Sequence, residues 1–371
     1  MKIYIRLTAV AVMVMTMIFS VNGFAKENTI NELIHSSISS LENSLESKEK
    51  NILSDEKILP AGSSASDWIA MVLAFAGESN TYAEYLEELE DYTIEQYAKN
   101  GCLDLHKATE YHRIALTMLA LGGEPSNIVH GKESINLIAD GTWNFCAGSP
   151  AEQGSNGLIY ALLVLEAKDE YLSEDQESFK EELIQELLNY QDSEGGFYLN
   201  KSFGADIDMT AMAIQALAPY QENPELTLSI ERAVAWILER ISSATSSEAV
   251  SQTILALCAL GIDPETNDQF IQNGWTLLDR LNSFRTEEGL YKHELQEDAS
   301  NIVATYQAVL ALEAVDRLRT DGTWIFDFDH YEFSEQINVS NPSMIWLCIP
   351  AVLILGAAAG IMVIRKKNKN A

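Results

Sequence analysis

The sequence predicts an all-α fold: an (α/α)6 toroid of six helical hairpins, with an inner and an outer ring, plus one C-terminal transmembrane helix. Six short apolar segments recur at steps of 43 to 53 residues, and longer charged segments alternate with them. Strand patterns are nearly absent. A repeat of this length is one supersecondary unit that cannot bury its apolar face alone. Six such units favour a closed ring in which the inner helices start at one shared rim.

The repeated segments are apolar on nearly all sides, so we expect them to be buried inner helices. Each begins with a polar residue and ends near Gly, Ala or Pro, and they cover 67–77, 110–122, 156–167, 206–218, 248–261 and 301–314. The charged segments between them are predicted as outer helices because their apolar residues recur three and four positions apart. These segments cover 29–48, 83–99, 128–139, 175–190, 228–241 and 268–284.

The two ends of the chain predict export and membrane attachment. Lys2 and Arg6 precede an apolar stretch, and Gly23-Phe24-Ala25 has the small-x-small pattern of a cleavage site. Met344–Ile364 holds 21 uncharged residues and is followed by four basic ones. We therefore expect a single-pass cell-membrane protein with an extracellular ectodomain and a cytoplasmic C-terminus. The predicted parts are a signal peptide (1–25), a toroid (26–326), a stalk (327–343), a span (344–364) and a basic tail (365–371).

The chain is strongly acidic, with a formal net charge of −31. This charge argues against nucleic acid as a partner, because phosphates would be repelled. The four cysteines show no CxxC pair and no zinc-ligand spacing. Cys102 and Cys146 each precede one of two consecutive inner helices. In an oxidising location they could pair, and two free thiols fit the sequence equally well.

Short glycine-rich breaks before the inner helices carry a family resemblance. Gln191-Asp192-Ser193-Glu194-Gly195-Gly196-Phe197 resembles the Q-x3-G-x-[FW] repeat of terpenoid cyclases and protein prenyltransferases, and weaker copies lie at 284–291 and 140–143. Those families share the toroid, as do the cobalamin carriers of the intrinsic factor and transcobalamin group. The segments at Thr109, Asp206 and Ser247 are more similar to bacterial cell-surface prenyltransferase and squalene oxidase repeat proteins. The resemblance covers about 66–324 and implies the fold more than the chemistry.

Asp206-Ile207-Asp208-Met209-Thr210-Ala211 resembles the D-x-D-D-T-A motif of class II terpene cyclases. The resemblance makes Asp208, with Asp206 beside it, the catalytic candidate, because the middle acid of that motif donates a proton. Here Met209 replaces the third acid, which weakens the inference. The alternative is that Asp206 or Asp208 caps the helix. The prenyltransferase zinc motif D-x-C is absent, so no metal and no cofactor is expected, and the likeness to the carriers makes cobalamin or another corrinoid a candidate ligand.

The shared rim is the predicted binding site, since polar and aromatic side chains at helix starts can hold a polar or amphipathic ligand. The candidate ligand-binding residues are Trp68, Glu110, Tyr111, His112, Arg113, Asn156, Asp206, Asp208, Glu248, Gln252, Tyr306 and Gln307. The alternative is that they only cap helices and pair with one another, for example Arg113 with Glu110.

Three functions follow from these residues. The first is non-catalytic binding of an extracellular small molecule (corrinoid-like), glycan or peptide. The second is an enzyme of terpene cyclase-like or polysaccharide-degrading type that uses the rim carboxylates. The third is a surface scaffold or adhesion module that meets a partner protein. The residues favour the first over the second.

Overall fold

The computed structural model describes residues 30–47, 49, 51–77, 82–168 and 172–329. The chain divides into two units, Met1–Tyr331 and Glu332–Ala371, and the second lies outside the described residues. The predicted signal peptide, span and basic tail also lie outside them, and the predicted stalk is described only to Asp329.

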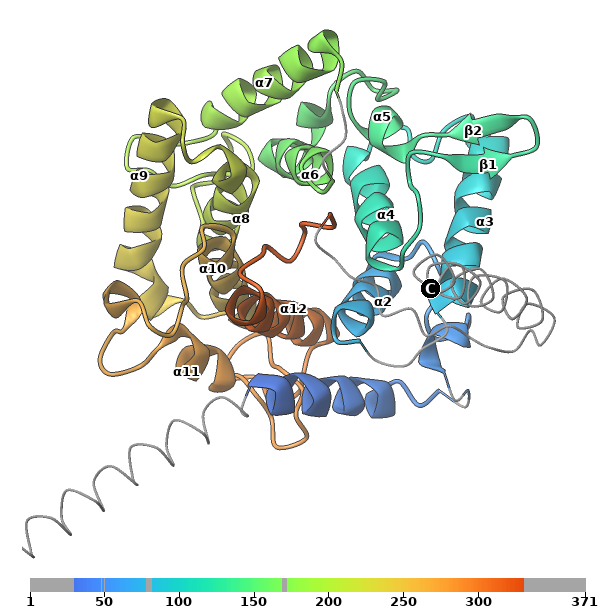
Figure 1. Ribbon diagram of the computed structural model, residues 1–371. Helices are drawn as coiled ribbons and strands as arrows, with labels where there is room; N and C mark the ends of the chain where they lie inside the picture. The colour runs from blue at the N-terminus through green and yellow to red at the C-terminus, as the bar shows by residue number, and fades with distance from the viewer. Residues whose placement is uncertain (1–29, 48, 50, 78–81, 169–171, 330–371) are drawn as a thin grey trace, which may run out of the picture. The chain divides into compact units, whose positions relative to one another are not determined.

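The described part of the first unit has an inner ring of helices. Each inner helix packs against the next one along the chain, and α12 contacts α2, so the ring is closed (Figure 1). Because an outer segment separates successive inner helices, all of them run in the same direction and start at the same end. The inner helices are α2 (Ser64–Phe75), α4 (Ala108–Ala120), α6 (Ser155–Leu165), α8 (Ile207–Leu217), α10 (Ser247–Ala259) and α12 (Ile302–Thr320).

The outer layer consists of amphipathic helices that bury one face. In α7, Leu183, Ile184 and Leu187 are buried against the inner ring, while Ser173 caps the helix start with a capping box. The outer helices are 30–44, α3 (Tyr82–Asn100), α5 (Leu137–Gly141), α7 (Glu174–Leu188), α9 (Pro224–Arg240) and α11 (Leu277–Asn282). Short 3-10 turns join the layers: η1 (Ile52–Ser54), η2 (Pro150–Gln153), η3 (Ala218–Tyr220), η4 (Ile241–Ser243) and η5 (Asp268–Phe270).

The fold class predicted from the sequence is corrected on two points. Among the described residues, no helix has both the length and the apolar character needed to cross a bilayer, and the segment predicted to do so, 344–364, is not among them. The fold is also not purely helical. Strands β1 (Ile128–His130) and β2 (Glu133–Ile135) form an antiparallel hairpin where a helix was predicted over 128–139. Gly131, at φ +66°, makes the turn, and Asn136 then caps the short α5.

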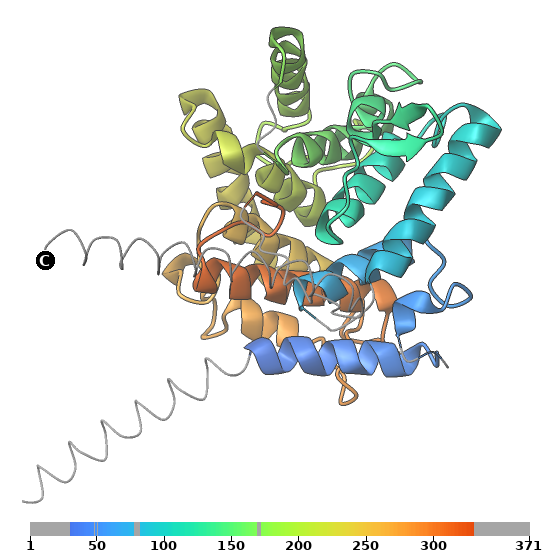
Figure 2. The same cartoon turned by 45° about the vertical axis from the view of Figure 1, so that its right-hand side comes forward.

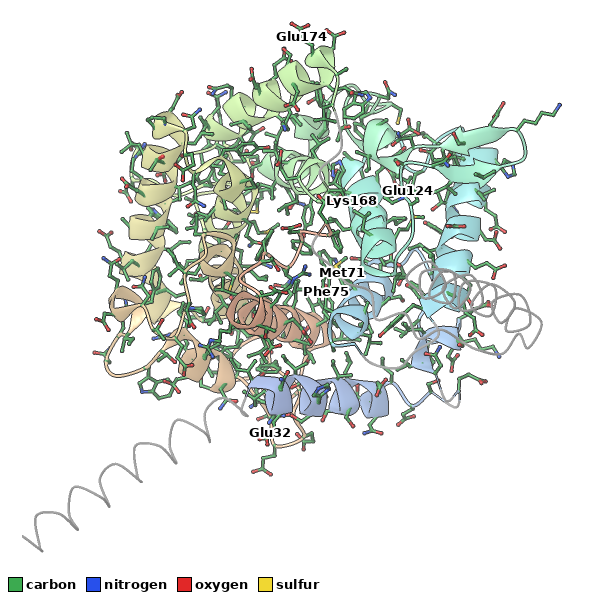
Figure 3. All side chains as sticks on the ribbon, in the orientation of Figure 1. Glu32, Met71, Phe75, Glu124, Lys168 and Glu174 are labelled. Atoms are coloured by element: carbon green, nitrogen blue, oxygen red, sulfur yellow. The ribbon has the colours of Figure 1, made fainter. Side chains whose placement is uncertain are left out.

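The segment after α12 folds back across the C-terminal ends of the inner helices (Figures 1 and 2). The backbone N–H of Phe328 donates to the carbonyl of Ala167, which follows α6, at 2.9 Å. The ring of Phe328 stacks on Phe75, the last residue of α2, at 6.0 Å. Figure 3 shows Phe75 and Met71 on the inner side of α2. This segment therefore covers the end of the ring that is opposite the helix starts.

We predict that Gly157→Ala destabilises the fold by about 1–3 kcal/mol or more, because a methyl group there overpacks a backbone contact. A Cβ on Gly157 in α6 would lie 1.9 Å from the carbonyl oxygen of Pro150 in η2, so the turn would have to move. Urea unfolding measures the change. Gly204→Ala is the matched control, because a Cβ there meets nothing within 4 Å. Equal stability of the two variants would contradict the prediction.

Candidate binding site at the start of the inner ring

The predicted site residues lie in the first two turns of the inner helices, except for Asp206, which directly precedes α8. Asn156, Asp208 and Glu248 each stand at the second position of their helix, and Trp68, Tyr306 and Gln252 stand about one turn further in. Because the inner helices share one direction, the second positions form a polar layer nearest to the helix starts. The positions one turn further along form a layer of aromatic and amide side chains.

Three aromatic side chains meet across the interior of the ring. The Trp68 ring lies parallel to that of Tyr306 in α12, with centroids 6.2 Å apart. It also lies 6.2 Å from Tyr160 in α6. In the ring, α4 separates α2 from α6, so the contact between Trp68 and Tyr160 spans the interior. Burial raises the pKa of Tyr306 to about 12, and it also raises that of Tyr160, so both phenols stay protonated and can donate hydrogen bonds. We call Trp68, Tyr160 and Tyr306 the aromatic cluster.

A series of glutamine amides runs beside the aromatic cluster over three neighbouring inner helices. Gln215 in α8 donates to Gln252 in α10 at 2.9 Å, and Gln252 donates to Gln307 in α12 at 3.1 Å. Gln215 is buried, whereas Gln252 and Gln307 are half-buried. Each amide therefore holds the next one in place. Among the described residues, the Nε2 group of Gln307 has no acceptor, so it remains available to a ligand.

Asp208, Glu248 and His293 form an acidic cluster at the starts of α8 and α10. Glu248 Oε2 accepts from His293 Nδ1 at 2.9 Å and from the Ser247 hydroxyl at 3.2 Å. Asp208 Oδ1 is buried and has no hydrogen-bond partner among the described residues. Burial, with the charges of Asp206 and Glu248, raises the pKa of Asp208 to about 6. The hydrogen bond to Glu248 raises the pKa of His293.

The two catalytic candidates have different roles in the structure. Asp206 is the N-cap of α8, and its Oδ1 accepts from the backbone N–H of Met209 at 2.7 Å. Asp208 lies inside the first turn and caps nothing. Burial raises the pKa of Asp206, whereas its bonds to backbone N–H groups lower it. Capping therefore accounts for Asp206, and the unpartnered oxygen is on Asp208.

Arg113 and Glu110 belong to a buried ion-pair network. Arg113 Nε donates to Asp67 Oδ2 at 2.9 Å, and its Nη1 lies 2.8 Å from Glu110 Oε2. Its Nη2 donates to the carbonyl of Gly62 at 2.8 Å. Asp67 also accepts from the N–H of Gly62 and from the hydroxyl of Tyr85. The guanidinium is thus occupied in holding α2, α4 and the turn at Gly62 together.

Tyr111 and His112 contact outer segments and not the aromatic cluster. The Tyr111 hydroxyl donates to the carbonyl of Asp104 at 2.9 Å, and its ring packs edge-on against Phe145. His112 is fully buried, and its Nε2 lies 2.7 Å from the carbonyl of Gly141. Burial lowers the pKa of His112 to about 4, so the ring is neutral at physiological pH. Both residues therefore have structural contacts, although the Nδ1 of His112 is buried without a hydrogen-bond partner among the described residues.

Three residues of this site were not predicted from the sequence: Tyr160, Gln215 and His293. Tyr160 stands one turn after Asn156, and Gln215 lies two turns after Asp208, so helical spacing from the predicted residues would have found both. No helical spacing from a predicted residue points to His293. It reaches Glu248 because the backbone N–H of Ser247 donates to the carbonyl of His293, an interaction between segments 46 residues apart.

We predict that Asp208→Asn stabilises the protein by about 1–3 kcal/mol at pH 8. The pKa of Asp208 is about 6 in the folded state against an ordinary value of 3.8. The folded state thus favours the protonated acid, and its stability falls as the pH rises from about 4 through 6. Asparagine carries no charge, so the gain of the variant should shrink as the pH is lowered.

Urea unfolding at pH 8, 6.5 and 5 measures this gain, with the lowest pH kept above the isoelectric point of about 4.4. Glu174→Gln, at an exposed first-turn carboxylate of α7, is the control and should show a small change at all three values. A gain for Asp208→Asn that did not vary with pH would contradict the prediction.

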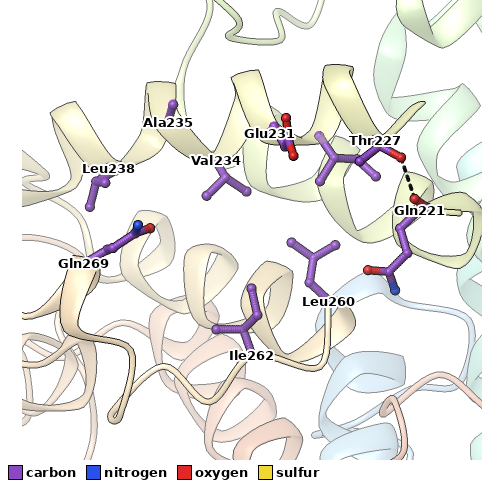
Figure 4. A pocket seen from close by; sticks show the side chains of 10 residues that line it. Gln221, Thr227, Glu231, Val234, Ala235, Leu238, Leu260, Ile262 and Gln269 are labelled. Atoms are coloured by element: carbon purple, nitrogen blue, oxygen red, sulfur yellow. Dashed lines mark hydrogen bonds between the residues drawn. The ribbon is translucent and has the colours of Figure 1, made fainter. Parts of the chain in front are cut away.

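A separate cavity of about 570 Å³ lies between α9 and the segment that follows α10 (Figure 4). Its wall is mainly aliphatic, with Val234 and Leu238 from α9 facing Leu260 and Ile262. None of the predicted site residues lines it.

Comparisons of this chain with protein-family models, with curated proteins and with solved structures returned no match.

Proposed function

We propose that this protein binds a neutral, hydroxyl-rich ligand of the sugar type without converting it chemically. The ligand binds at the end of the ring where the inner helices start. The aromatic cluster carries the proposal, because three rings meeting across the ring interior offer a stacking surface to the apolar face of a sugar. The half-buried amides of Gln252 and Gln307 beside it provide donors and acceptors for hydroxyl groups.

The charges at the site support a neutral ligand. The positive charge of Arg113 acts on Tyr160 and Tyr306, but Arg113 is paired with Asp67 and Glu110. An anionic ligand would meet the acidic cluster and the net charge of −31. The protonated form of Asp208 can also donate to a hydroxyl oxygen, which a neutral sugar presents.

Calorimetric titration of the full chain with chitotriose, cellotriose and maltotriose tests the proposal. We expect one of these sugars to bind with a dissociation constant of roughly 10–100 μM, and cyanocobalamin and a polyanionic oligosaccharide not to bind. Cyanocobalamin binding without sugar binding would replace the sugar by a corrinoid. No heat with any neutral sugar would refute the proposal as stated.

Two matched glutamine variants locate the site. Gln307→Ala removes the end of the glutamine series and should weaken sugar binding about tenfold, the effect of one hydrogen bond. Gln269→Ala removes an exposed amide at the separate cavity and should leave binding unchanged. The opposite pattern would place the sugar in the separate cavity.

A second candidate function is acid catalysis on a polysaccharide, and the unpartnered oxygen of Asp208 is the observation that favours it. A carboxyl group with a pKa near 6 can act as a general acid, and Glu248 provides the second carboxylate that glycoside hydrolysis needs. Release of reducing ends from a polysaccharide that is lost in Asp208→Asn would establish this function. Sugar binding by the parent protein without any release of reducing ends favours the binding protein.

A further inference from the structure

Two thiols on neighbouring loops lie close together in the structure. The Sγ atoms of Cys102 and Cys146 are 3.8 Å apart. Cys102 follows α3 in the loop that leads to α4, and Cys146 lies in the loop between α5 and η2, ahead of α6. Both loops therefore lie at the end of the ring where the inner helices start. Cys258, by contrast, is buried within α10.

The loops around the two thiols are already held in position. The Tyr111 hydroxyl donates to the carbonyl of Asp104, two residues after Cys102. The Tyr111 ring packs against Phe145, the residue before Cys146, with centroids 5.8 Å apart. The Cys146 thiol itself lies 3.4 Å from the carbonyl of Asp104. Tyr111 thus joins the two loops without a covalent bond, and the thiols face each other across that junction.

Closing the bond needs a small movement. A disulfide brings the sulfur atoms to about 2.05 Å, so they must approach by roughly 1.7 Å. Cys146 is exposed, whereas Cys102 is buried. Gly101 and Gly148, which lie near the two cysteines, have nothing within 4 Å of a Cβ position, so the space beside each of these glycines is open.

We propose that Cys102 and Cys146 form a disulfide bond that ties the loop before α4 to the loop before α6. The oxidant is a low-molecular-weight disulfide, RSSR. The thiolate of exposed Cys146 attacks RSSR, which gives a mixed disulfide and releases one RS⁻. The thiolate of Cys102 then attacks the Cys146 sulfur and releases the second RS⁻. The two cysteines lose two hydrogens and two electrons, and RSSR is reduced to two RSH.

Peptide mapping of the full chain tests the bond without any variant. The protein is incubated with oxidised glutathione, blocked with an alkylating agent under unfolding conditions and cut with trypsin. We expect peptides 100–107 and 133–168 to appear as one disulfide-linked species, and two of the four cysteines to react with the alkylating agent. Four reactive thiols, a bond to Cys258, or a lasting glutathione adduct on Cys146 alone would each overturn the proposal.

Stability provides an independent readout. Under oxidising conditions Cys146→Ser should lower the Tm by about 4–8 °C, because the bond closes a loop of about 45 residues. Cys102→Ser and the double variant should show the same loss. After treatment with dithiothreitol, the parent protein and Cys146→Ser should melt together. A Tm of the parent that did not respond to the reductant would show that the two thiols are free.

Discussion

Asp67→Ala is expected to lower the free energy of unfolding by about 3–5 kcal/mol, because it leaves a buried guanidinium without its main counter-ion. The Asp67 side chain is fully buried and Arg113 nearly so. Asp67 also accepts from the N–H of Gly62 at 3.0 Å and from the Tyr85 hydroxyl at 2.7 Å. The substitution therefore leaves three donors without this acceptor in a part of the protein that water does not reach. Urea unfolding at pH 7 measures the loss.

Glu110→Gln is the control for this prediction. Glu110 pairs with the same guanidinium, but its side chain is 27% exposed, so its loss should cost below about 1 kcal/mol. A double variant tests whether the loss of stability comes from the unpaired charge that a single substitution leaves buried. Asp67→Leu combined with Arg113→Met should be less destabilised than the sum of the two single changes, because no charge is then left buried. Additive losses would contradict this account.

The buried ion-pair network of Asp67, Arg113 and Glu110 shows why the sequence alone could not distinguish structural residues from binding residues at the starts of the inner helices. Arg113, Glu110 and Tyr111 are polar or aromatic residues at the start of an inner helix, and so are Glu248 and Tyr306. Their roles differ through partners that lie far away in the chain, such as Gly62 for Arg113. The same limit applies to Asp206 and Asp208, since only coordinates show which of the two accepts the backbone N–H of Met209.

The helices follow the hydrophobic patterns closely, with two exceptions. The outer helix predicted over 268–284 forms only η5 and the short α11, and the one predicted over 128–139 forms a hairpin ahead of α5. Each apolar segment read from the sequence lies in an inner helix, because a segment that is apolar on all sides can be stable only when neighbours cover it. Residues 128–139 have apolar positions at helical spacing, yet they begin with Ile128 and Val129 and carry Gly131 in the middle. β-branched residues and a glycine with positive φ favour a hairpin. These local preferences prevailed here over the helical spacing of the apolar residues.

Phe328→Ala is expected to destabilise the protein by about 3–5 kcal/mol, the cost of removing a buried aromatic side chain. Phe328 is 4% exposed although it falls in the segment predicted as a stalk. Its ring stacks on Phe75, and Arg317 in α12 fixes the chain just before it by donating from Nη2 to the carbonyl of Asp327 at 2.8 Å. Thermal or urea unfolding of the full chain measures the effect.

Phe203→Ala is the matched control, because Phe203 is 62% exposed in the loop before α8, and its loss should change stability by less than about 0.5 kcal/mol. The contrast tests where the fold ends. If 321–329 is part of the core and covers the end of the ring, the losses of stability from the two substitutions must differ by several kcal/mol. If that segment were only a connection leading away from the ring, both substitutions would have equally small effects. A large loss for Phe328→Ala with sugar binding unchanged would further show that the two ends of the ring act independently, one in folding and the other in recognition.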